Sequence, residues 1–492
     1  MTVFRIPVVY DDSSKPGRRE LGLAGLRTGL TKVFDGVVRR SERVGEVAEL
    51  MGLGLEDVRL PVYDEAEVEV EPGDVVYVTG ESGGGKSLLI RHLAAEMAKH
   101  PDFAPVAASW NVKVRRDRPL IDLVGGDVYQ GVETLSAAGL SDVFTWFRCF
   151  DELSDGQRMR FIFAKAVGSG AKTVVLDEFC SSLDRETAKA TAYTLQRFAR
   201  KRKTTLIAAT AVNDLLEDLN PSLYIVKHFG PRLEVNRLDP KPKPCSLLNK
   251  VLVEEGSTED WRLLSFLHYR SHRLGGVVRI FRAVLEGRVV GVVVYSNPYL
   301  KPAGFSRFFD TEWYLTQRFG NVLRIQRVVV HPSFRGIGVA RKLLQMSMPR
   351  LDVAFVEILS SMEKLVPFTK GFMHRFVADT APAKKARLEE FRSMFGIDLQ
   401  KHGVAEVMGF IARRGMLGTL RKWLEKNIAF FAEMKNVERR LDVKTMARLL
   451  KTVKSSASPK VYGVWVNPSP KHRKTVERAL RKDSGVLLNQ LL

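Results

Sequence analysis

Residues 80–87 read GESGGGKS and form a complete glycine-rich phosphate-binding loop. The apolar run DVVYVT at 74–79 comes directly before the loop and predicts a buried strand, and a helix is expected to begin near Lys86. In this strand–loop–helix context, backbone N–H groups and the positive end of the helix dipole face a bound anion. The loop therefore predicts a nucleotide-binding α/β domain.

The residues that would handle the nucleotide follow from this motif and from a second apolar strand, TVVLDE at 173–178. Lys86 is expected to reach the β- and γ-phosphates, while Ser87 and Asp177 would bind Mg²⁺. Glu178 would polarise the attacking water as general base. The predicted ATP contacts in this half of the site are Gly80, Ser82, Gly83, Gly85, Lys86, Ser87 and Asp177.

Two further motifs follow in order, LSDGQ at 153–157 and SSLD at 181–184. Together with the phosphate loop and VVLDE, they resemble the nucleotide-binding domain of ABC-type ATPases over about residues 60–235. The resemblance implies a head-to-tail homodimer that encloses two ATP molecules. Each ATP bound by Lys86 of one chain would also touch the other chain, through its Ser154, Gly156 and Gln157.

The sequence departs from that family at two places. The family usually has a histidine after the next strand, but TLIAATAVND at 205–214 contains none, so slow hydrolysis is expected unless Asn213 substitutes. The stretch between Lys86 and Leu153 is short, which predicts a small helical subdomain and leaves Gln130 as the candidate for the family's glutamine loop. Because that region docks the membrane subunit in transporters, its reduction argues against a transporter role.

A second motif lies at 325–340, which reads IQRVVVHPSFRGIGVA. An apolar strand leads into Arg-x-x-Gly-x-Ala, and a helix is expected to open at Arg341. With a hairpin at 278–295, a strand at 351–359 and PFTKGF at 367–372, this segment resembles GNAT-type N-acyltransferases over about residues 248–378. The resemblance implies acetyl-CoA or another acyl-CoA as donor. Its expected contacts are Val328, Val330, Arg335, Gly336, Gly338 and Ala340.

The acid and base of the acyl transfer are harder to place. Many GNAT relatives use a tyrosine just before the Gly-Phe pair as the acid that protonates the leaving thiolate, and this chain has Phe368 there. The candidate catalytic residues are therefore Glu357 on the strand at 351–359 and Tyr269 and His272 in LHYRSH at 267–272. Glu357 has the alternative role of a structural ion-pair partner. The alternative roles of the histidines are those of packing or surface residues. His268 and His272 could also form a metal-binding pair, for which no third ligand is evident.

The formal net charge is +21 and is unevenly distributed. Residues 381–492 contain 24 Lys and Arg against 10 Asp and Glu, and helical periodicity over 411–455 gives one basic face. A polyanionic partner, most simply nucleic acid, is expected. The alternatives are a solvated basic surface and a membrane-surface helix. Trp423, Phe430 and Phe431 are base-stacking candidates or, at this spacing, core residues.

The predicted organisation is an α/β fold class in which an ABC-type P-loop ATPase domain is followed by a GNAT-like α+β domain and a basic, mainly helical C-terminal region. The proline-rich segment LDPKPKP at 238–244 marks the main linker. With no run of about 18 apolar residues and no signal-peptide pattern, a cytoplasmic protein without membrane association is expected. The predicted parts are an N-terminal extension (1–55), the ATPase domain (56–240), the acyltransferase domain (245–380) and the basic helical region (381–492).

The pairing of the two domains resembles a family of archaeal and phage fusion proteins. YRSH at 269–272, RVVVHP at 327–332 and the segment 362–368 also resemble Mom-like phage DNA-modification proteins. These resemblances imply a nucleobase acceptor in RNA or DNA. Two alternatives stay open: an N-acetyltransferase acting on proteins and regulated by an ATPase clamp, and a non-catalytic ATP-dependent nucleic-acid clamp.

Overall fold

The computed structural model of the chain forms two compact units. The first comprises Met1–His272 with Arg282–Val292 and Val329–Leu343, and the second comprises Arg273–Phe281, Val293–Val328 and Leu344–Leu492. Within them the structure describes residues 4–6, 33–36, 41–52, 58–63, 68–268, 274–364, 366–378, 382–432, 441–457 and 460–481. The four sequence-derived parts stay predictions, and the elements are given below as the structure has them.

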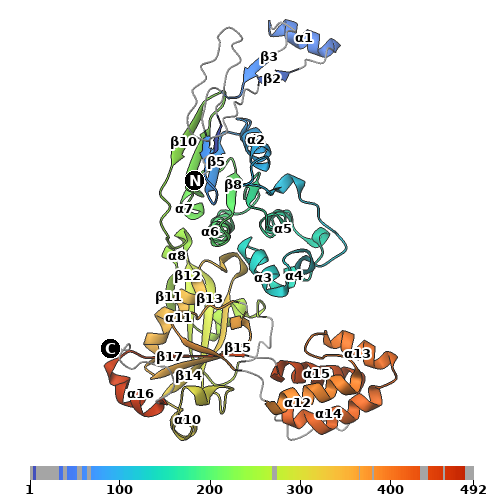
Figure 1. Cartoon of the computed structure of the whole chain (residues 1–492). Coiled ribbons are helices and arrows are strands. Elements are labelled where there is room, and N and C mark those ends of the chain that lie inside the picture. The colour runs from blue at the N-terminus through green and yellow to red at the C-terminus, as the bar shows by residue number, and fades with distance from the viewer. Residues whose placement is uncertain are drawn as a thin grey trace. The chain divides into compact units, whose positions relative to one another are not determined.

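A six-stranded sheet, in the order β10-β9-β5-β8-β7-β6, is the centre of the first unit (Figure 1). Its strands are β5 (Val75–Gly80), β6 (Val106–Ala108), β7 (Thr173–Leu176), β8 (Thr205–Ala209), β9 (Leu223–Lys227) and β10 (Leu233–Arg237). β6, β7, β8, β5 and β9 run parallel, and β10 runs antiparallel to β9. The carboxyl ends of β5 and β7 therefore meet at one edge, which brings the phosphate loop and the two strand-end carboxylates together.

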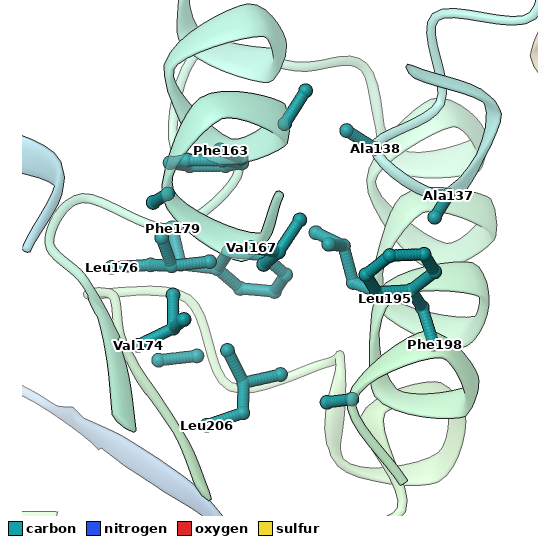
Figure 2. Packing of buried hydrophobic residues seen from close by; sticks show 14 of the residues in the cluster. Ala137, Ala138, Phe163, Val167, Val174, Leu176, Phe179, Leu195, Phe198 and Leu206 are labelled. Atoms are coloured by element: carbon teal, nitrogen blue, oxygen red, sulfur yellow. The ribbon is translucent and has the colours of Figure 1, made fainter. Parts of the chain in front are cut away.

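Helices cover both faces of this sheet, because parallel strands are apolar on both sides. They are α2 (Lys86–Ala98), α3 (Val128–Ala137), α4 (Val143–Trp146), α5 (Asp155–Val167), α6 (Arg185–Arg202) and α7 (Leu216–Leu219). Figure 2 shows Phe163 of α5 and Leu195 of α6 among the buried side chains that pack over Val174 and Leu206. On the other face, α2 packs against β5 and β8. Packing of these helices on the sheet fixes the positions at which β5 and β7 end and at which α2 and α5 begin.

Two small strand pairs and a helix belong to the N-terminal part. β1 (Phe4–Ile6) pairs with β4 (Val68–Val70), and β2 (Val33–Gly36) pairs with β3 (Val58–Pro61), both antiparallel. The helix of this part is α1 (Glu42–Leu50). Its first turn is capped by the Ser41 hydroxyl, which accepts a hydrogen bond from the Val44 N–H.

A seven-stranded sheet follows in the order β11-β12-β13-β14-β15-β17-β16. Its strands are β11 (Leu252–Glu255), β12 (Val277–Leu285), β13 (Arg288–Ser296), β14 (Val322–Val330), β15 (Phe355–Ser360), β16 (His374–Ala378) and β17 (Lys460–Val466). The expected hairpin is β12 and β13 joined at Glu286 and Gly287. β15 begins later than the strand expected over 351–359, because a 3-10 turn that contains Pro349, η6 (Met348–Leu351), comes just before it.

Short helices connect these strands. They are α8 (Ser246–Lys250), α9 (Thr258–Ser265), α10 (Thr311–Gln317), the 3-10 turn η5 (Pro332–Phe334), α11 (Val339–Ser347) and α16 (Arg473–Ala479). η5 and α11 follow β14 directly, as the Arg-x-x-Gly-x-Ala motif predicts. α11 begins two residues before Arg341, where the sequence pattern placed its start.

After β16 the chain leaves the seven-stranded sheet, forms the basic region after residue 381, and returns to the same sheet as β17. A helical bundle of α12 (Pro382–Phe395), α13 (Val404–Arg413), α14 (Leu417–Ala432) and α15 (Val443–Ala457) separates β16 from β17. β17 then pairs with β15 on one side and β16 on the other. Trp423 is buried in the bundle core, so it is not a base-stacking residue, and the side chains of Phe430 and Phe431 lie outside the described residues.

Among the residues that the structure describes, no helix is both long enough and apolar enough to cross a membrane.

Candidate functional site

The phosphate loop joins β5 to α2, so its backbone N–H groups precede the first turn of the helix. Lys86 is buried, and its Nζ donates hydrogen bonds to the carbonyl oxygens of Gly80 (2.9 Å) and Glu81 (2.7 Å). Burial lowers the pKa of Lys86, while the negative charges of Glu178 and Asp177 oppose that change. The ammonium is thus held inside the loop, where the predicted phosphates would lie.

The two predicted Mg²⁺ ligands lie side by side, although 90 residues separate them. The Ser87 hydroxyl donates a hydrogen bond of 3.0 Å to Asp177 Oδ1. A hydroxyl and a carboxylate oxygen at this spacing are hard ligands of the kind that Mg²⁺ prefers, and Mg²⁺ completes its shell with water and phosphate oxygens. Ser87 and Asp177 therefore fit the metal that the motif implies, which would neutralise charge on the phosphates.

Glu178 stands at the end of β7 with an exposed side chain and a φ of +51°. This left-handed conformation is uncommon for a residue with a side chain and is found preferentially at functional sites. The Glu178 carbonyl accepts a hydrogen bond of 3.0 Å from the Ser181 hydroxyl. The turn aims the carboxylate away from the protein core, as a general base for water requires.

The LSDGQ signature forms the start of α5. Ser154 is exposed at the N-cap, and its backbone N–H donates to the Gln157 side-chain oxygen at 3.1 Å. Gln157 therefore serves as the reciprocal partner of a capping box. A Cβ placed on Gly156 would lie 2.9 Å from Leu183 Cδ2, so the signature packs against the SSLD segment. Ser154 remains at the surface, where a second chain has access to it.

The two residues offered for missing family features have different surroundings. Asn213 is exposed in the loop after β8, where Val212 accepts hydrogen bonds from Tyr77 and Thr79. Gln130 lies in the first turn of α3, and its side-chain oxygen accepts from the Gly126 N–H at 3.0 Å. Gln130 thus stabilises the turn in which it lies.

The acyl-CoA motif begins where β14 ends, and two glycines shape it. Gly336 and Gly338 have φ values of +84° and +108°, which residues with side chains rarely adopt. A Cβ on Gly336 would lie 2.8 Å from Thr194 Cγ2. The guanidinium of Arg335 donates to the carbonyls of Val330 at 2.8 Å and Ser141 at 2.5 Å, and burial lowers the pKa of this group. The backbone N–H groups of the loop can donate hydrogen bonds to an anion, whereas the Arg335 side chain donates to protein carbonyls.

The strand before this loop parts from its neighbour. β14 pairs with β15 in parallel from Val322–Phe355 to Arg324–Glu357, and their register ends there. The later residues of β14 include Val328, which is half-buried, and Val330, which is buried. The resemblance to GNAT-type acyltransferases implies that the pantetheine of acyl-CoA would pair with this later part of β14, which lies beyond the register with β15. Ala340, the last predicted contact, lies in the first turn of α11.

Glu357 is fully buried on β15, at the last position that pairs with β14. Its carboxylate accepts hydrogen bonds from the Tyr299 N–H (2.9 Å), the Tyr314 hydroxyl (3.0 and 3.1 Å) and the Tyr462 hydroxyl (2.6 Å). Burial raises the pKa of Glu357, while these hydrogen bonds and the charge of Arg324 oppose the rise. The arrangement resembles a sealed structural network more than an accessible base.

The sequence pattern missed Tyr314 and Tyr462, whose hydroxyls both reach Glu357. They lie 43 and 105 residues from it, on α10 and β17, so no local spacing could have joined them. The other two catalytic candidates, Tyr269 and His272, lie outside the described residues. His268 is described, and its ring meets that of Trp261 edge-on at 5.9 Å.

The fold and these sites define a class of protein: a P-loop ATPase joined to an N-acyltransferase. Residues 242–352 match the family model described as Acetyltransferase (GNAT) family. The N-terminal part, about a third of the chain, is similar to ATP-binding proteins. One is phosphonates import ATP-binding protein PhnC 1 of Cupriavidus metallidurans, 22% identical over 209 residues (34% of this chain, 73% of the relative). Another is cell division ATP-binding protein FtsE of Streptococcus pneumoniae, 25% identical over 193 residues (33% and 83%).

Among solved structures, the dimeric structure of MJ0796, a bacterial ABC transporter cassette, matches 36% of this chain and 91% of its own, with 13% identity and a TM-score of 0.29. The family model and the relatives confirm the predicted fold class and the prediction of an enzyme that joins an ABC-type ATPase to a GNAT-type acyltransferase. The likeness to Mom-like proteins and an archaeal or phage origin stay predictions.

Proposed function

We propose that this chain is an ATP-hydrolysing N-acyltransferase that moves an acyl group from CoA to a nucleobase amine of RNA or DNA. The amine nitrogen attacks the thioester carbonyl carbon, the carbon–sulfur bond breaks, and CoA leaves as a thiolate. The nitrogen loses one proton and the thiolate gains one, so the reaction needs no further reactant. ATP is hydrolysed to ADP and phosphate. In this reaction Lys86 binds the phosphates and Glu178 polarises the attacking water.

The observation that carries the nucleic-acid part is the place of the basic bundle in the second sheet. The bundle leaves after Ala378 of β16 and returns at Lys460 of β17, and these two residues pair with each other. Next to them, Ser360 at the end of β15 pairs with Val461. Since β14 and β15 are parallel, β14 also ends at this edge, and the predicted acyl-CoA loop comes next in the chain. The chain thus leaves the sheet for the bundle, and returns from it, at the edge where β14 and β15 end.

The charge of the bundle supports a polyanionic acceptor. Residues 382–457 contain 17 Lys and Arg against 8 Asp and Glu. On α15, Lys444, Arg448 and Lys451 are exposed and share one face at helical spacing, while the opposite face is buried against the rest of the bundle. A cationic face of this kind binds phosphates without reading base sequence. It would hold a nucleic acid while the acceptor base reaches the transferase.

The homodimer is part of the same proposal. Ser154 is exposed at the start of α5, and the predicted γ-phosphate contacts of the signature are therefore presented outward. A helix N-terminus with exposed donors attracts an anion such as the phosphate bound by a second chain. We infer that two chains enclose two ATP molecules, and that this closure prepares the nucleic acid for acyl transfer.

The direct test is acyl transfer with purified full-length protein. The protein is incubated with ATP, Mg²⁺, isotopically labelled acetyl-CoA and either RNA or DNA, and the nucleic acid is then digested to nucleosides for mass spectrometry. The proposal predicts one nucleoside whose mass has increased by one labelled acetyl group. Label found on protein lysines or N-termini instead would favour a protein N-acetyltransferase, and nucleic-acid binding without any transfer would favour a non-catalytic clamp.

A binding measurement tests the role of the bundle separately. The triple variant K444A/R448A/K451A should bind nucleic acid more weakly, and its affinity should depend less steeply on salt, by about 0.9 in log–log slope per lost phosphate contact. The matched control is K113A/K241A/K243A, which removes three exposed lysines outside the bundle. Equal losses in the two variants would mean that the bundle has no special part in binding.

A further inference from the structure

The predicted acyl-CoA loop is bonded to the ATPase part of the first unit. Arg335 Nη1 donates to the carbonyl of Ser141, which lies between α3 and α4, and Arg335 Nε donates to the carbonyl of Val330 at the end of β14. One guanidinium therefore joins the start of the loop to the helical subdomain that also contains the LSDGQ signature. A side chain held between two carbonyls has a fixed orientation.

A second set of contacts joins the loop to α6. Gly336 approaches Thr194 of α6 so closely that a Cβ on the glycine would lie 2.8 Å from Thr194 Cγ2. At the start of α6, Glu186 forms an ion pair with Arg288 of β13. The Arg288 guanidinium also lies 5.7 Å from the centre of the Phe334 ring, in the turn just before Arg335. The 3-10 turn η5 as a whole packs against α6.

Both sets of contacts involve elements that are connected to motifs of the ATP site, namely SSLD and the LSDGQ signature. α6 begins directly after SSLD, and Asp184 of that motif caps the helix by accepting the Thr187 N–H at 2.9 Å. On the other route, Arg160 of α5 donates to the carbonyl of Gly156 in the signature at 3.1 Å and to that of Gly139 at 2.8 Å. Gly139 is two residues from Ser141, which holds Arg335.

We propose that Arg335 is a positioning residue that ties the acyl-CoA loop to the ATPase, so that ATP and acyl-CoA affect each other's binding. ATP enclosed by two chains acts on the signature and on SSLD, and these two motifs contact the supports of the loop. Any change in the loop's freedom between the nucleotide-free and ATP-bound states then changes its affinity for acyl-CoA. By thermodynamic linkage, acyl-CoA changes the affinity for ATP by the same factor. The inference rests on the ATP and acyl-CoA parts of the proposed function and is independent of the acceptor.

The test measures the dissociation constant of acetyl-CoA by calorimetry with full-length E178Q protein, in which bound ATP is hydrolysed slowly. The measurement is made without nucleotide and with saturating ATP and Mg²⁺. The proposal predicts that the two dissociation constants differ by about 5- to 150-fold. The ratio is the quantity of interest, because a variant that merely weakens the loop changes both constants alike.

Charge-reversal variants identify the route. E186R and R288E should each bring the ratio toward 1, and the double variant E186R/R288E, which restores the ion pair but not the contact of Arg288 with the Phe334 ring, should recover it in part. R335Q should also bring the ratio toward 1. The matched control is R262E, which breaks the exposed ion pair between Arg262 and Glu259 on α9 and should leave the ratio unchanged.

Each other outcome has a defined meaning. Acetyl-CoA that binds equally well with and without ATP overturns the coupling but leaves the proposed function intact. A ratio that persists in R335Q and in both single charge reversals overturns the assignment of the route to these residues. Failure of acetyl-CoA to bind in either state overturns this inference together with the acyl-CoA part of the proposed function, and absence of nucleic-acid acylation alone affects neither.

Discussion

Two glutamates in this chain stand in opposite surroundings. Glu178 is exposed at the end of β7, in a left-handed turn beside Lys86 and Asp177. Glu357 is fully buried on β15 and accepts hydrogen bonds from two tyrosine hydroxyls and one backbone N–H. The first can meet a water molecule, whereas the second is enclosed by its own donors. Both are predicted catalytic residues, and their surroundings favour that prediction for Glu178 and disfavour it for Glu357.

The largest expected effect concerns Glu178. The change Glu178→Gln removes the predicted base and should lower kcat for ATP hydrolysis by about 10²- to 10⁴-fold, while ATP still binds to Lys86 and Ser87. Steady-state phosphate release and equilibrium nucleotide binding measure the two effects. Glu217→Gln, at an exposed glutamate on α7, is the control. Unchanged hydrolysis in E178Q would place the base elsewhere and weaken the contrast with Glu357.

A smaller effect is expected at the network around Glu357. Tyr462→Phe removes a hydrogen bond to a buried carboxyl and should lower the free energy of unfolding by about 1.5–3 kcal/mol if that carboxyl is charged. Tyr295→Phe is the matched control, because the Tyr295 hydroxyl is also buried but bonds to the neutral Ser347 hydroxyl at 2.6 Å. Its expected cost is about 0.5–1.5 kcal/mol. Denaturant unfolding followed by circular dichroism compares them, and equal losses would argue that Glu357 is protonated.

The smallest expected effect is on the pH dependence of the free energy of unfolding. Burial raises the pKa of Glu357 above its ordinary value of 4.5. The folded protein therefore holds the proton of the Glu357 carboxyl group more tightly than the unfolded chain does. The associated stabilisation is complete below pH 4.5 and is lost as the pH rises through the folded-state pKa, by about 1.4 kcal/mol for each pH unit that separates the folded and unfolded pKa values. Glu357→Gln should abolish this dependence. Wild type and E357Q with parallel pH profiles would show that Glu357 has an ordinary pKa.

The same contrast explains how far the sequence could lead. Residues 80–87, 153–157 and 173–178 are each contiguous, so their geometry is local and only the juxtaposition of Ser87 with Asp177 had to come from the sheet. Glu357, by contrast, meets Tyr314 and Tyr462 only because β15 lies beside β17 and α10 folds back over the sheet. No spacing in the chain records these contacts, and they decide what the carboxylate can do.

The bundle shows a second limit of sequence patterns. Charge and periodicity predict a basic, mainly helical region after residue 381, and within that range the structure has the strand β17 (Lys460–Val466). Whether that strand belongs to the bundle or to the preceding sheet depends on long-range pairing, which helical periodicity does not encode. β17 pairs with β15 and β16, so the bundle is an insertion in the acyltransferase sheet.

The central claim is that one chain uses ATP to acylate a nucleic acid, and its most direct measurement is the nucleotide dependence of label transfer. Wild-type and E178Q protein are compared in the reaction with labelled acetyl-CoA and nucleic acid, with and without ATP and Mg²⁺, and the nucleosides are analysed by mass spectrometry. We predict an acylated nucleoside whose yield rises with ATP in the wild type and falls in E178Q under multiple turnover. Label that never reaches a nucleoside in any of these reactions would contradict the claim.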